Sequence, residues 1–321
     1  MIGRVALLSL AAAASVAFAQ NVPYPERPVK LVVGFPAGGP TDIVARMFGE
    51  RAAQALHQPF VVDDKPGANS IIATEAVASA APDGYTLLAA AQNHAMIPAL
   101  YADRIRFDAS KSFAPICIVA KSPTVLVVSP KMGVKSLQEF LAKVREKPGT
   151  YTYASVGIGS AVHLATAHLL EMTKTSMTHV PYKGGAPAST ALLAGEVDAY
   201  LATVGTVIQQ IKLGKVVALA VAAPERSRLV PDIPTFAEQG VANFNAEVWY
   251  GLLAPAGTPN AIVRTLEAQA DGFAKDAAVR DRLVAAGIEP VSTCGAAFAK
   301  ELDAEIATYK RVAKALDLKV E

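Results

Sequence analysis

The amino-acid sequence predicts an α/β fold built from two similar lobes, and three observations support this prediction. Apolar strand-like runs alternate with helix-like stretches along most of the 321 residues, a pattern typical of βαβ units with largely parallel sheets. A chain of this length exceeds what one hydrophobic core usually supports. A strand, a glycine-rich turn and a helix around Gly38 are followed by a glycine loop at Gly67, and the same series recurs at Gly157 and Gly184.

The stretch VKLVVGFPAGGPTD, residues 29–42, carries the first candidate site. Residues 30–34 are expected to form a buried strand, residues 35–40 break it, and a helix is expected from Thr41 to about Leu56. Such a turn directs free backbone N–H groups and the positive end of a helix dipole at one point, which suits a carboxylate or phosphate. The alternative is a tight turn in which Thr41 or Asp42 only caps the helix.

The remaining elements follow in chain order. The first lobe continues with a strand at 59–62, a helix at 71–80, a strand at 85–91 and a helical piece before Tyr101. An apolar passage at 113–128 contains Pro115 and Pro123 and is expected to leave this lobe for the second. The second lobe is expected to contain helices at 136–146, from 160 to about 173 and at 188–193, with strands at 151–155, 178–181 and 197–202.

The last third of the chain completes both lobes. We expect strands at 216–222 and 247–253, a short helix beginning at 231–235, and helices from 258 to about 273, at 277–286 and at 295–316. If these last helices return to the first lobe, the chain crosses between lobes near 122–125 and 244–248, which is a hinge topology. The sequence thus predicts lobe 1 at 20–123 plus 247–321 and lobe 2 at 124–246.

The N-terminus reads as a signal peptide at residues 1–19. Arg4 precedes an apolar run from Val5 to Phe18, and Ala17-Phe18-Ala19 provides a small-residue cleavage pattern before Gln20. No later apolar run approaches the roughly 18 residues that span a bilayer. We therefore expect a soluble protein exported to the periplasm.

Charge and residue types limit the functional classes. A formal net charge of +2 argues against nucleic acid as a partner. The five histidines lack metal-ligand spacing, and Gly157-Ile158-Gly159 lacks the third glycine of a dinucleotide fingerprint, so no metal and no cofactor are expected. Cys117 and Cys294 could pair in an oxidising compartment. Because nothing in the sequence brings them together, two unpaired and mostly buried thiols are favoured.

Several motifs, taken together and in order, resemble one family. They are VGFPAGGPTD at 33–42, APDGYTLL at 81–88, SVGIGSAVH at 155–163, HVPYKGGAPA at 179–188, LAGEVD at 193–198, PDIPT at 231–235, WYGL at 249–252 and APAGTP at 254–259. This set is similar to the substrate-binding proteins of tripartite tricarboxylate transporters, also called Bug-type periplasmic receptors. The resemblance covers essentially the whole mature chain.

The resemblance implies a monomeric periplasmic-binding-protein fold that closes on a small carboxylate like a Venus flytrap and delivers it to a membrane permease, without catalysing a reaction. It implies ligand contacts from the first turn and, in the second lobe, from the Ser-x-Gly-x-Gly-Ser-x-x-His stretch. A loop at Asn93 is expected to border the pocket. The residues so implied are Phe35, Ala37, Gly38, Gly39, Thr41, Asp42, Asn93, Ser155, Gly157, Gly159, Ser160 and His163.

Departures from the family pattern leave the ligand open among di- or tricarboxylates, aromatic acids and acidic amino acids. The family's Gly-Ala-Gly-Gly-Asn-Ile-Gly loop is replaced by residues 67–73, GANSIIA, and its Thr-His-Ala-x-Asn-Pro by residues 93–98, NHAMIP. A more apolar wall at Ile71 or Ile97 could favour an aromatic or longer-chain acid over citrate.

Two other functional classes remain as alternatives. Ser160 and His163 are three residues apart on a predicted helix, as in an exported Ser/His hydrolase. The absence of a Gly-x-Ser-x-Gly turn and of an evident acid partner disfavours that hypothesis. The other alternative is a ligand sensor that docks on a membrane sensor kinase of a two-component system.

Overall fold

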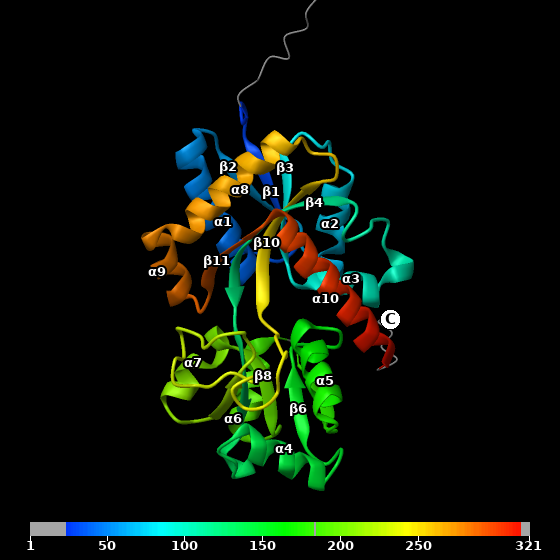
Figure 1. The fold of residues 1–321 in the computed structure, drawn as a ribbon, viewed down its shortest axis with the longest axis vertical. Helices are drawn as coiled ribbons and strands as arrows, with labels where there is room; N and C mark the ends of the chain where they lie inside the picture. The colour runs from blue at the N-terminus through cyan, green and yellow to red at the C-terminus, as the bar shows by residue number, and fades with distance from the viewer. Residues whose placement is uncertain (1–23, 183, 316–321) are drawn as a thin grey trace, which may run out of the picture.

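The computed structural model describes residues 24–182 and 184–315, so the expected signal peptide at 1–19 lies outside it. The molecule is elongated and consists of two lobes, each a β-sheet flanked by helices, placed one above the other along the long axis (Figure 1). The two-lobed α/β fold predicted from the sequence is confirmed. Within the described ranges no helix combines the length and the hydropathy that crossing a membrane would need.

Lobe 1 contains a six-stranded sheet in the order β11-β4-β10-β3-β1-β2. Strands β1, β2 and β3 run parallel, whereas β10 is antiparallel to β3 and β4, and β11 is antiparallel to β4. Its elements are β1 (Val29–Val33), α1 (Pro40–Leu56), β2 (Phe60–Asp64), α2 (Ile71–Ala78), β3 (Thr86–Ala91), α3 (Asn93–Leu100), β4 (Phe113–Ser122), β10 (Val248–Pro255), α8 (Asn260–Lys275), α9 (Ala277–Ala285), β11 (Glu289–Cys294) and α10 (Gly295–Ala315).

Lobe 2 contains a five-stranded sheet in the order β7-β6-β8-β5-β9. Strands β6, β7 and β8 are parallel, and β5 is antiparallel to β8 and β9. Its elements are β5 (Thr124–Val128), α4 (Leu137–Glu146), β6 (Thr152–Ser155), α5 (Ala161–Thr173), β7 (Thr178–Pro181), α6 (Gly185–Ala194), β8 (Ala199–Thr203), α7 (Val204–Lys212) and β9 (Val217–Val221).

The repeat seen in the sequence is a repeat of topology. The order β2-β1-β3 followed by the antiparallel β10 corresponds to β7-β6-β8 followed by the antiparallel β5. The parallel pairing that we expected is confined to each βαβαβ unit, and the sheets are mixed. The reason is that β5 and β10 enter their sheets from the other lobe and therefore run against the neighbouring strand.

Three local predictions differ from the structure. Residues 231–235 form turns instead of a helix, and Thr235 makes a single bridge to Val221. Helix α7 was not expected, although its apolar residues Val204, Val207, Ile208 and Ile211 have helical spacing. Strand β11 was not expected either, because it lies at the sheet edge with half-exposed side chains and has no clear apolar alternation.

The expectation of two unpaired thiols is wrong, because Cys117 and Cys294 form a disulfide. Cys117 lies in β4 and Cys294 ends the neighbouring β11, where the two residues are directly opposite each other in the antiparallel register. Their Cα atoms are 4.0 Å apart. The pairing could not be foreseen without β11, since that strand alone brings Cys294 to β4.

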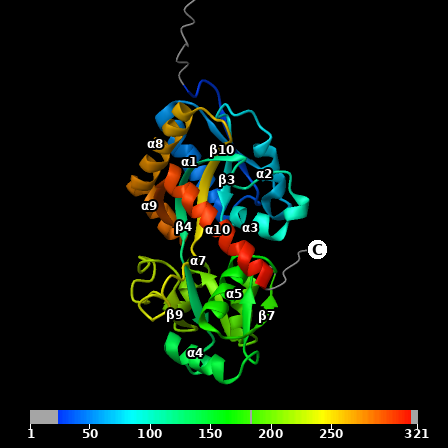
Figure 2. The same cartoon turned by 45° about the vertical axis from the view of Figure 1, so that its right-hand side comes forward.

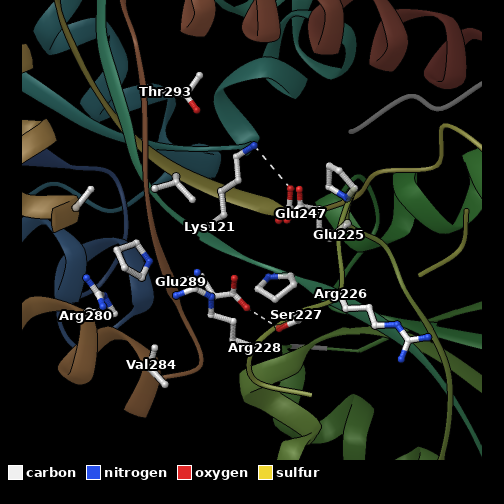
Figure 3. A pocket seen from close by; sticks show the side chains of 16 residues that line it. Lys121, Glu225, Arg226, Ser227, Arg228, Glu247, Arg280, Val284, Glu289 and Thr293 are labelled. Atoms are coloured by element: carbon white, nitrogen blue, oxygen red, sulfur yellow. Dashed lines mark hydrogen bonds and ion pairs between the residues drawn. The ribbon is translucent and has the colours of Figure 1, made fainter. Parts of the chain in front are cut away.

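The lobes are joined where β4 continues into β5 and where the chain returns into β10. At the hinge Lys121 lies 2.7 Å from Glu301 and 3.7 Å from Glu247. Behind the hinge is a polar cavity of about 640 Å³, in which Ser227 of lobe 2 donates a hydrogen bond of 2.5 Å to Glu289 of lobe 1 (Figure 3). We propose the lobe boundaries expected from the sequence, 20–123 plus 247–321 and 124–246, since they coincide with these crossings.

Helix α10 packs on both lobes. It runs diagonally from the upper lobe to α5 of the lower one (Figure 2). Leu164 and Ala167 of α5 share a buried cluster with Val312 of α10. Arg311 forms an ion pair with Glu171 at 2.5 Å on the surface above that cluster. The C-terminal helix therefore belongs to lobe 1 by its strand contacts and also contacts lobe 2.

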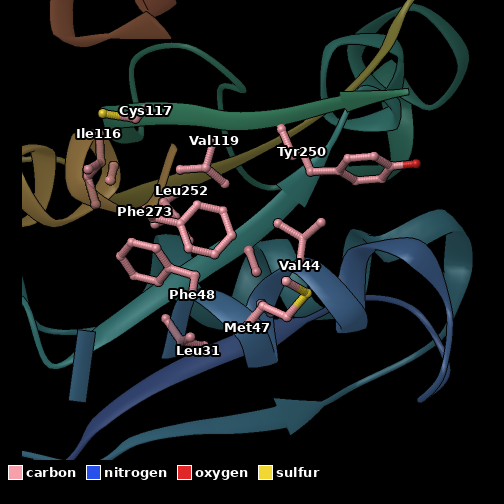
Figure 4. Close-up of a cluster of buried hydrophobic side chains, with 14 of the residues drawn as sticks. Leu31, Val44, Met47, Phe48, Ile116, Cys117, Val119, Tyr250, Leu252 and Phe273 are labelled. Atoms are coloured by element: carbon pink, nitrogen blue, oxygen red, sulfur yellow. The ribbon is translucent and has the colours of Figure 1, made fainter. Parts of the chain in front are cut away.

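The sheet of lobe 1 is buried on both faces. Leu31 and Val33 point to one hydrophobic cluster and Val32 to the other, as alternation along a strand requires. Figure 4 shows the first cluster, where the rings of Phe48 and Phe273 meet edge to face at 5.8 Å. This packing fixes α1 and α8 against the sheet and hence fixes the turn that precedes α1.

Candidate functional site

A cavity of about 780 Å³ lies between the lobes at the carboxyl ends of the parallel strands. Ligands of doubly wound α/β sheets bind at these ends. Both lobes contribute to its wall, lobe 1 through the turn before α1 and lobe 2 through the turn before α5. Its lining comprises residues 35–41, 69, 91–93, 156, 159–162, 184–185, 200, 203, 206, 248 and 250.

Five helices begin at this cleft. The residues that precede their first turns all line it, namely Gly39 before α1, Gln92 before α3, Ser160 before α5, Gly184 before α6 and Thr203 before α7. The first N–H groups of each helix lack helical partners, and each helix dipole is positive at this end. Helices from both lobes therefore give the cleft a positive potential that suits an anion.

The described residues that line the cleft include no Asp, Glu, Lys, Arg or His. Lys183, next to the lining residue Gly184, lies outside the described part of the chain. The polar groups in the wall are backbone amides, side-chain amides and hydroxyls, including Thr203 and Thr206, whose hydroxyls are 2.6 Å apart. In the described part of the wall, an anion would meet uncharged donors and helix ends.

The turn before α1, which we name elbow 1 (residues 34–40), depends on Asp42 for its shape. Gly38 has φ of 82°, a conformation that favours glycine, and it donates its N–H to Asp42 Oδ2 at 2.8 Å. Arg46 Nε lies 2.7 Å from Asp42 Oδ1 and also pairs with Asp64. Burial alone would raise the pKa of Asp42, but the hydrogen bonds from Arg46 and Gly38 outweigh it and lower this pKa below its ordinary value.

The capping prediction for elbow 1 needs correction. The helix begins at Pro40, so its N-cap is Gly39 and not Thr41 or Asp42. Proline is favoured at a first helical position because its missing N–H would have no partner there. Asp42, with a side chain 3% exposed, is turned away from the cleft toward Gly38 N–H and Arg46. The backbone N–H groups of Thr41 and Asp42 therefore remain without a partner inside the helix.

The turn before α5, which we name elbow 2 (residues 156–160), has an equivalent support made of neutral groups. Gly159 donates its N–H to His163 Nδ1 at 3.0 Å, and Ser160 caps α5 by accepting from His163 N–H. His163 stacks on His179 with ring centroids 3.8 Å apart, and His179 Nε2 lies 2.6 Å from Ser155 Oγ. Burial, with a further contribution from His179, lowers the pKa of His163 to about 4, so the ring is neutral at pH 7 and its Nδ1 accepts.

The residues predicted from the sequence divide into two groups. Those that line the cleft are Phe35, Ala37, Gly38, Gly39, Thr41, Asn93, Gly159 and Ser160. The other four do not line it. Gly157 lies within elbow 2, and the side chains of Asp42, Ser155 and His163 form hydrogen bonds to the backbones of the two elbows. Ile71 and Ile97 are buried in the core and form no wall of the cleft, so the ligand preference inferred from them is withdrawn.

Several lining residues were missed from the sequence. They include Asn69, Gln92, Gly185, Tyr200, Thr203, Thr206, Val248 and Tyr250. Gln92 directly follows β3 and Thr203 is the last residue of the equivalent strand β8, so the repeat itself contained the signal for them. Val248 and Tyr250 lie on a hinge strand, and no pattern in the sequence relates that strand to the cleft.

The geometry does not support a Ser–His nucleophile. Ser160 Oγ donates to the carbonyl of Gly157 at 2.7 Å, and the His163 ring nitrogen Nδ1 accepts from Gly159. Ser155, which does contact a histidine ring, is fully buried. Neither hydroxyl is arranged as a nucleophile with an adjacent base and an open face toward a substrate.

Comparisons with known proteins find relatives that are similar over most of this chain. BugT of Bordetella pertussis is 35% identical over 269 residues, which cover 84% of this chain and 82% of BugT. A TctC solute-binding protein from Polaromonas is 29% identical with a TM-score of 0.82 over 91% of this chain and 99% of that one.

Two of the similar solved structures hold adipate and malate. An R. palustris protein with adipate is 31% identical with a TM-score of 0.76 over 92% of this chain and 99% of its own. MatC of Rhodopseudomonas palustris with bound malate is 33% identical with a TM-score of 0.72 over 90% and 99%. The model of the tripartite tricarboxylate transporter family receptor matches residues 44–318. The resemblance seen in the sequence is thereby confirmed, and the chain belongs to this family of periplasmic solute receptors.

Proposed function

We propose that the protein is a periplasmic receptor for a small aliphatic dicarboxylate, which it binds between the lobes and delivers to the permease subunits of a tripartite tricarboxylate transporter. The observation that carries this proposal is the convergence of five helix N-termini, two from lobe 1 and three from lobe 2, on one cleft. Anionic groups at both ends of a short ligand would each meet helix ends of one lobe.

The wall of the cleft favours a dicarboxylate over an acidic amino acid. An ammonium group in a water-depleted site needs a carboxylate or several acceptors. The described lining has no acidic side chain, and Asp42 behind it accepts from Gly38 and is paired with Arg46. The adipate and malate bound by the two R. palustris relatives are both aliphatic dicarboxylates. This class is therefore preferred to aromatic acids and to tricarboxylates.

Ligand contacts are assigned to the lining residues of the two elbows and α3: Phe35, Ala37, Gly39, Thr41, Asn93, Gly159 and Ser160. Gly38 contributes its positive φ, whereas its N–H is used by Asp42. Asp42, Ser155, Gly157 and His163 keep the elbow backbones in place. The protein acts as a monomer without metal or cofactor, and closure of the lobes about the hinge is its mechanism, so no bond of the ligand is made or broken.

A thermal-shift screen of the mature protein tests this function. A ligand that binds only the folded state raises the melting temperature by mass action. We expect adipate, malate and other aliphatic dicarboxylates to raise it, and glutamate and benzoate at equal concentration to leave it unchanged. A response to glutamate alone would contradict the ligand class. Turnover of an ester or amide would contradict the receptor function itself.

A further inference from the structure

Gln92 connects the cleft to the C-terminal helix. It lines the cleft yet is only 3% exposed, because its amide points into a polar cluster under the hinge strand. Gln92 Nε2 donates to Tyr309 Oη at 2.7 Å and to Glu305 Oε1 at 3.3 Å. Trp249 Nε1 donates to the other carboxylate oxygen of Glu305 at 2.7 Å. The cluster therefore joins the cleft, strand β10 and helix α10.

The carboxylate of Glu305 fixes which end of the Gln92 amide faces the cleft. An ionised carboxylate only accepts hydrogen bonds, so it holds Nε2 toward α10. The carbonyl oxygen Oε1 is then the group left for a ligand. A carbonyl dipole directed at a carboxylate is unfavourable, whereas the five helix ends around it favour the same anion. In this orientation the carbonyl of Gln92 repels the carboxylate ligand that the helix ends attract.

Tyr309 has an unused hydroxyl hydrogen in this arrangement. Its oxygen accepts from Gln92 Nε2, and in the described part of the chain the structure gives no acceptor for its own O–H. If the amide turned over, both Tyr309 O–H and a protonated Glu305 could donate to Gln92 Oε1. Trp249 Nε1 would keep an acceptor on Glu305. The turned arrangement therefore satisfies the cluster only when Glu305 carries a proton.

We propose, on the basis of the receptor function given above, that Glu305 takes up one proton from solvent when the cleft binds a carboxylate, and that the amide of Gln92 turns over to donate to this ligand. Gln92 is thus a residue that determines specificity for an anion. Glu305 and Tyr309 are positioning residues that act through it. The O–H bond of Glu305 is the only covalent bond that forms, and the buffer supplies the proton.

The electrostatic surroundings place this proton in the physiological range. The pKa of Glu305 is raised to about 7, mainly by burial of the carboxyl group and also by the charge of Glu301 on the same helix. The hydrogen bonds from Trp249 and Gln92 and the charge of Lys121 on β4 act in the opposite direction. Lys121 is itself paired with Glu301 and Glu247. Burial raises the pKa of Tyr309 well above its ordinary value, so it stays a hydroxyl.

The sign of the pH dependence follows from proton uptake. A complex that binds one proton more than the free receptor loses affinity as pH rises above the pKa of the free group. The affinity for a dicarboxylate should therefore be constant below pH 7 and fall by up to about tenfold per pH unit above it. Ordinary carboxylic acids titrate near pH 4, so the ligand itself contributes nothing between pH 6 and 8.5.

Isothermal titration calorimetry of the wild-type mature protein with adipate and with malate, between pH 6 and 8.5, tests the proposal. At pH 8 we expect uptake of about one proton per ligand, measured as the dependence of the binding heat on the ionisation enthalpy of the buffer. Binding without proton uptake overturns this inference and leaves the receptor function standing. Failure of every dicarboxylate to bind at any pH overturns both.

Variants show whether Glu305, and not a neighbouring side chain, takes up the proton. Glu305→Gln keeps the shape and offers a neutral donor and acceptor, so it should bind with a Kd independent of pH and without proton uptake. Glu301→Gln is the matched control on the same helix and should keep the uptake. Tyr309→Phe should keep the uptake but weaken binding at pH 6 several-fold. A Glu305→Gln protein that still takes up a proton contradicts the assignment.

Discussion

Both lobes hold their elbow in the same way, since a glycine N–H is accepted by a helix side chain four residues later. In lobe 1 the pair is Gly38 and Asp42, and in lobe 2 it is Gly159 and His163. The acceptor in lobe 1 is a carboxylate with a guanidinium partner, whereas the acceptor in lobe 2 is a neutral imidazole stacked on His179. Lobe 1 also contains the disulfide between β4 and β11.

This difference shows that one backbone geometry can be stabilised by two chemistries that respond differently to the medium. A carboxylate whose pKa is lowered keeps accepting through mild acid, but a neutral imidazole stops accepting at Nδ1 when it is protonated. Lobe 1 should therefore lose stability when the disulfide is reduced or the charge pair of Asp42 is removed. Lobe 2 should lose stability in acid. The following changes test that contrast.

Removal of the disulfide should have the largest effect. The two cysteines are 177 residues apart in sequence, and cross-linking so long a loop restricts the unfolded chain strongly. The double variant Cys117→Ser, Cys294→Ser should lose about 2–5 kcal/mol in the free energy of unfolding, measured by urea denaturation. Reducing agent should have no effect on the double variant. Equal stability of reduced and oxidised wild-type protein would show that the bond does not stabilise lobe 1.

Asp42→Ala should come next. It leaves Gly38 N–H without its acceptor and leaves Arg46 with Asp64 alone. Because Arg46 is half exposed, we expect a loss of about 2 kcal/mol and not the larger cost of breaking a fully buried pair. Dicarboxylate affinity should fall with it as elbow 1 loosens. Asp42→Asn keeps an acceptor oxygen and serves as control, and unchanged stability and affinity in Asp42→Ala would argue against the role given to this carboxylate.

Acid should weaken elbow 2 before elbow 1. The pKa of His163 is about 4 in the folded protein against an ordinary value of 6.5, so its contribution is complete above pH 6.5 and is lost as pH falls toward 4. We expect about 2 kcal/mol from this group over that interval. The buried His94, whose pKa burial also lowers to about 4, acts in the same direction. The measurement is therefore the difference in pH dependence between wild type and His163→Asn, and identical profiles would contradict the role of the imidazole.

Arg311→Gln should have the smallest effect. The ion pair between Arg311 and Glu171 links α10 to α5, but both side chains are about half exposed. Such pairs contribute about 0–1 kcal/mol. We expect a change of less than about 1 kcal/mol in unfolding and little change in dicarboxylate affinity at 0.15 M salt. A large loss of affinity would mean that this contact, and not the hinge strands alone, sets how the lobes are placed.

The sequence was sufficient for the fold and for part of the candidate site. Strand and helix periodicity, with two glycine turns, predicted both βαβαβ units and the residues Phe35, Gly39 and Ser160 that line the cleft. Edge strand β11 has no apolar alternation, so the sequence could not predict the strand. It therefore could not predict the disulfide that depends on the strand either. Asp42 and His163 were recognised as special, but their direction away from the cleft depends on side-chain packing.

The rest of the site arises from contacts between distant segments. Gln92 and Glu305 are brought together only when α10 packs across the sheet, and Tyr250 reaches the cleft only because β10 crosses between lobes. Such pairings carry no local signal in composition or periodicity. The mixed sheets have the same origin, because antiparallel neighbours are added by strands that return from the other lobe.

Whether both lobes bind a carboxylate can be tested by comparing the affinities of the wild-type receptor for adipate and for hexanoate, by calorimetry at pH 6.5. Hexanoate keeps the six-carbon chain and one carboxylate but loses the second. If helix ends of both lobes each bind one carboxylate, hexanoate should bind at least about 100-fold more weakly, since charge-assisted hydrogen bonds from one lobe are lost. Similar affinities for the two acids would show that only one lobe binds an anion and would contradict a site shared by both lobes.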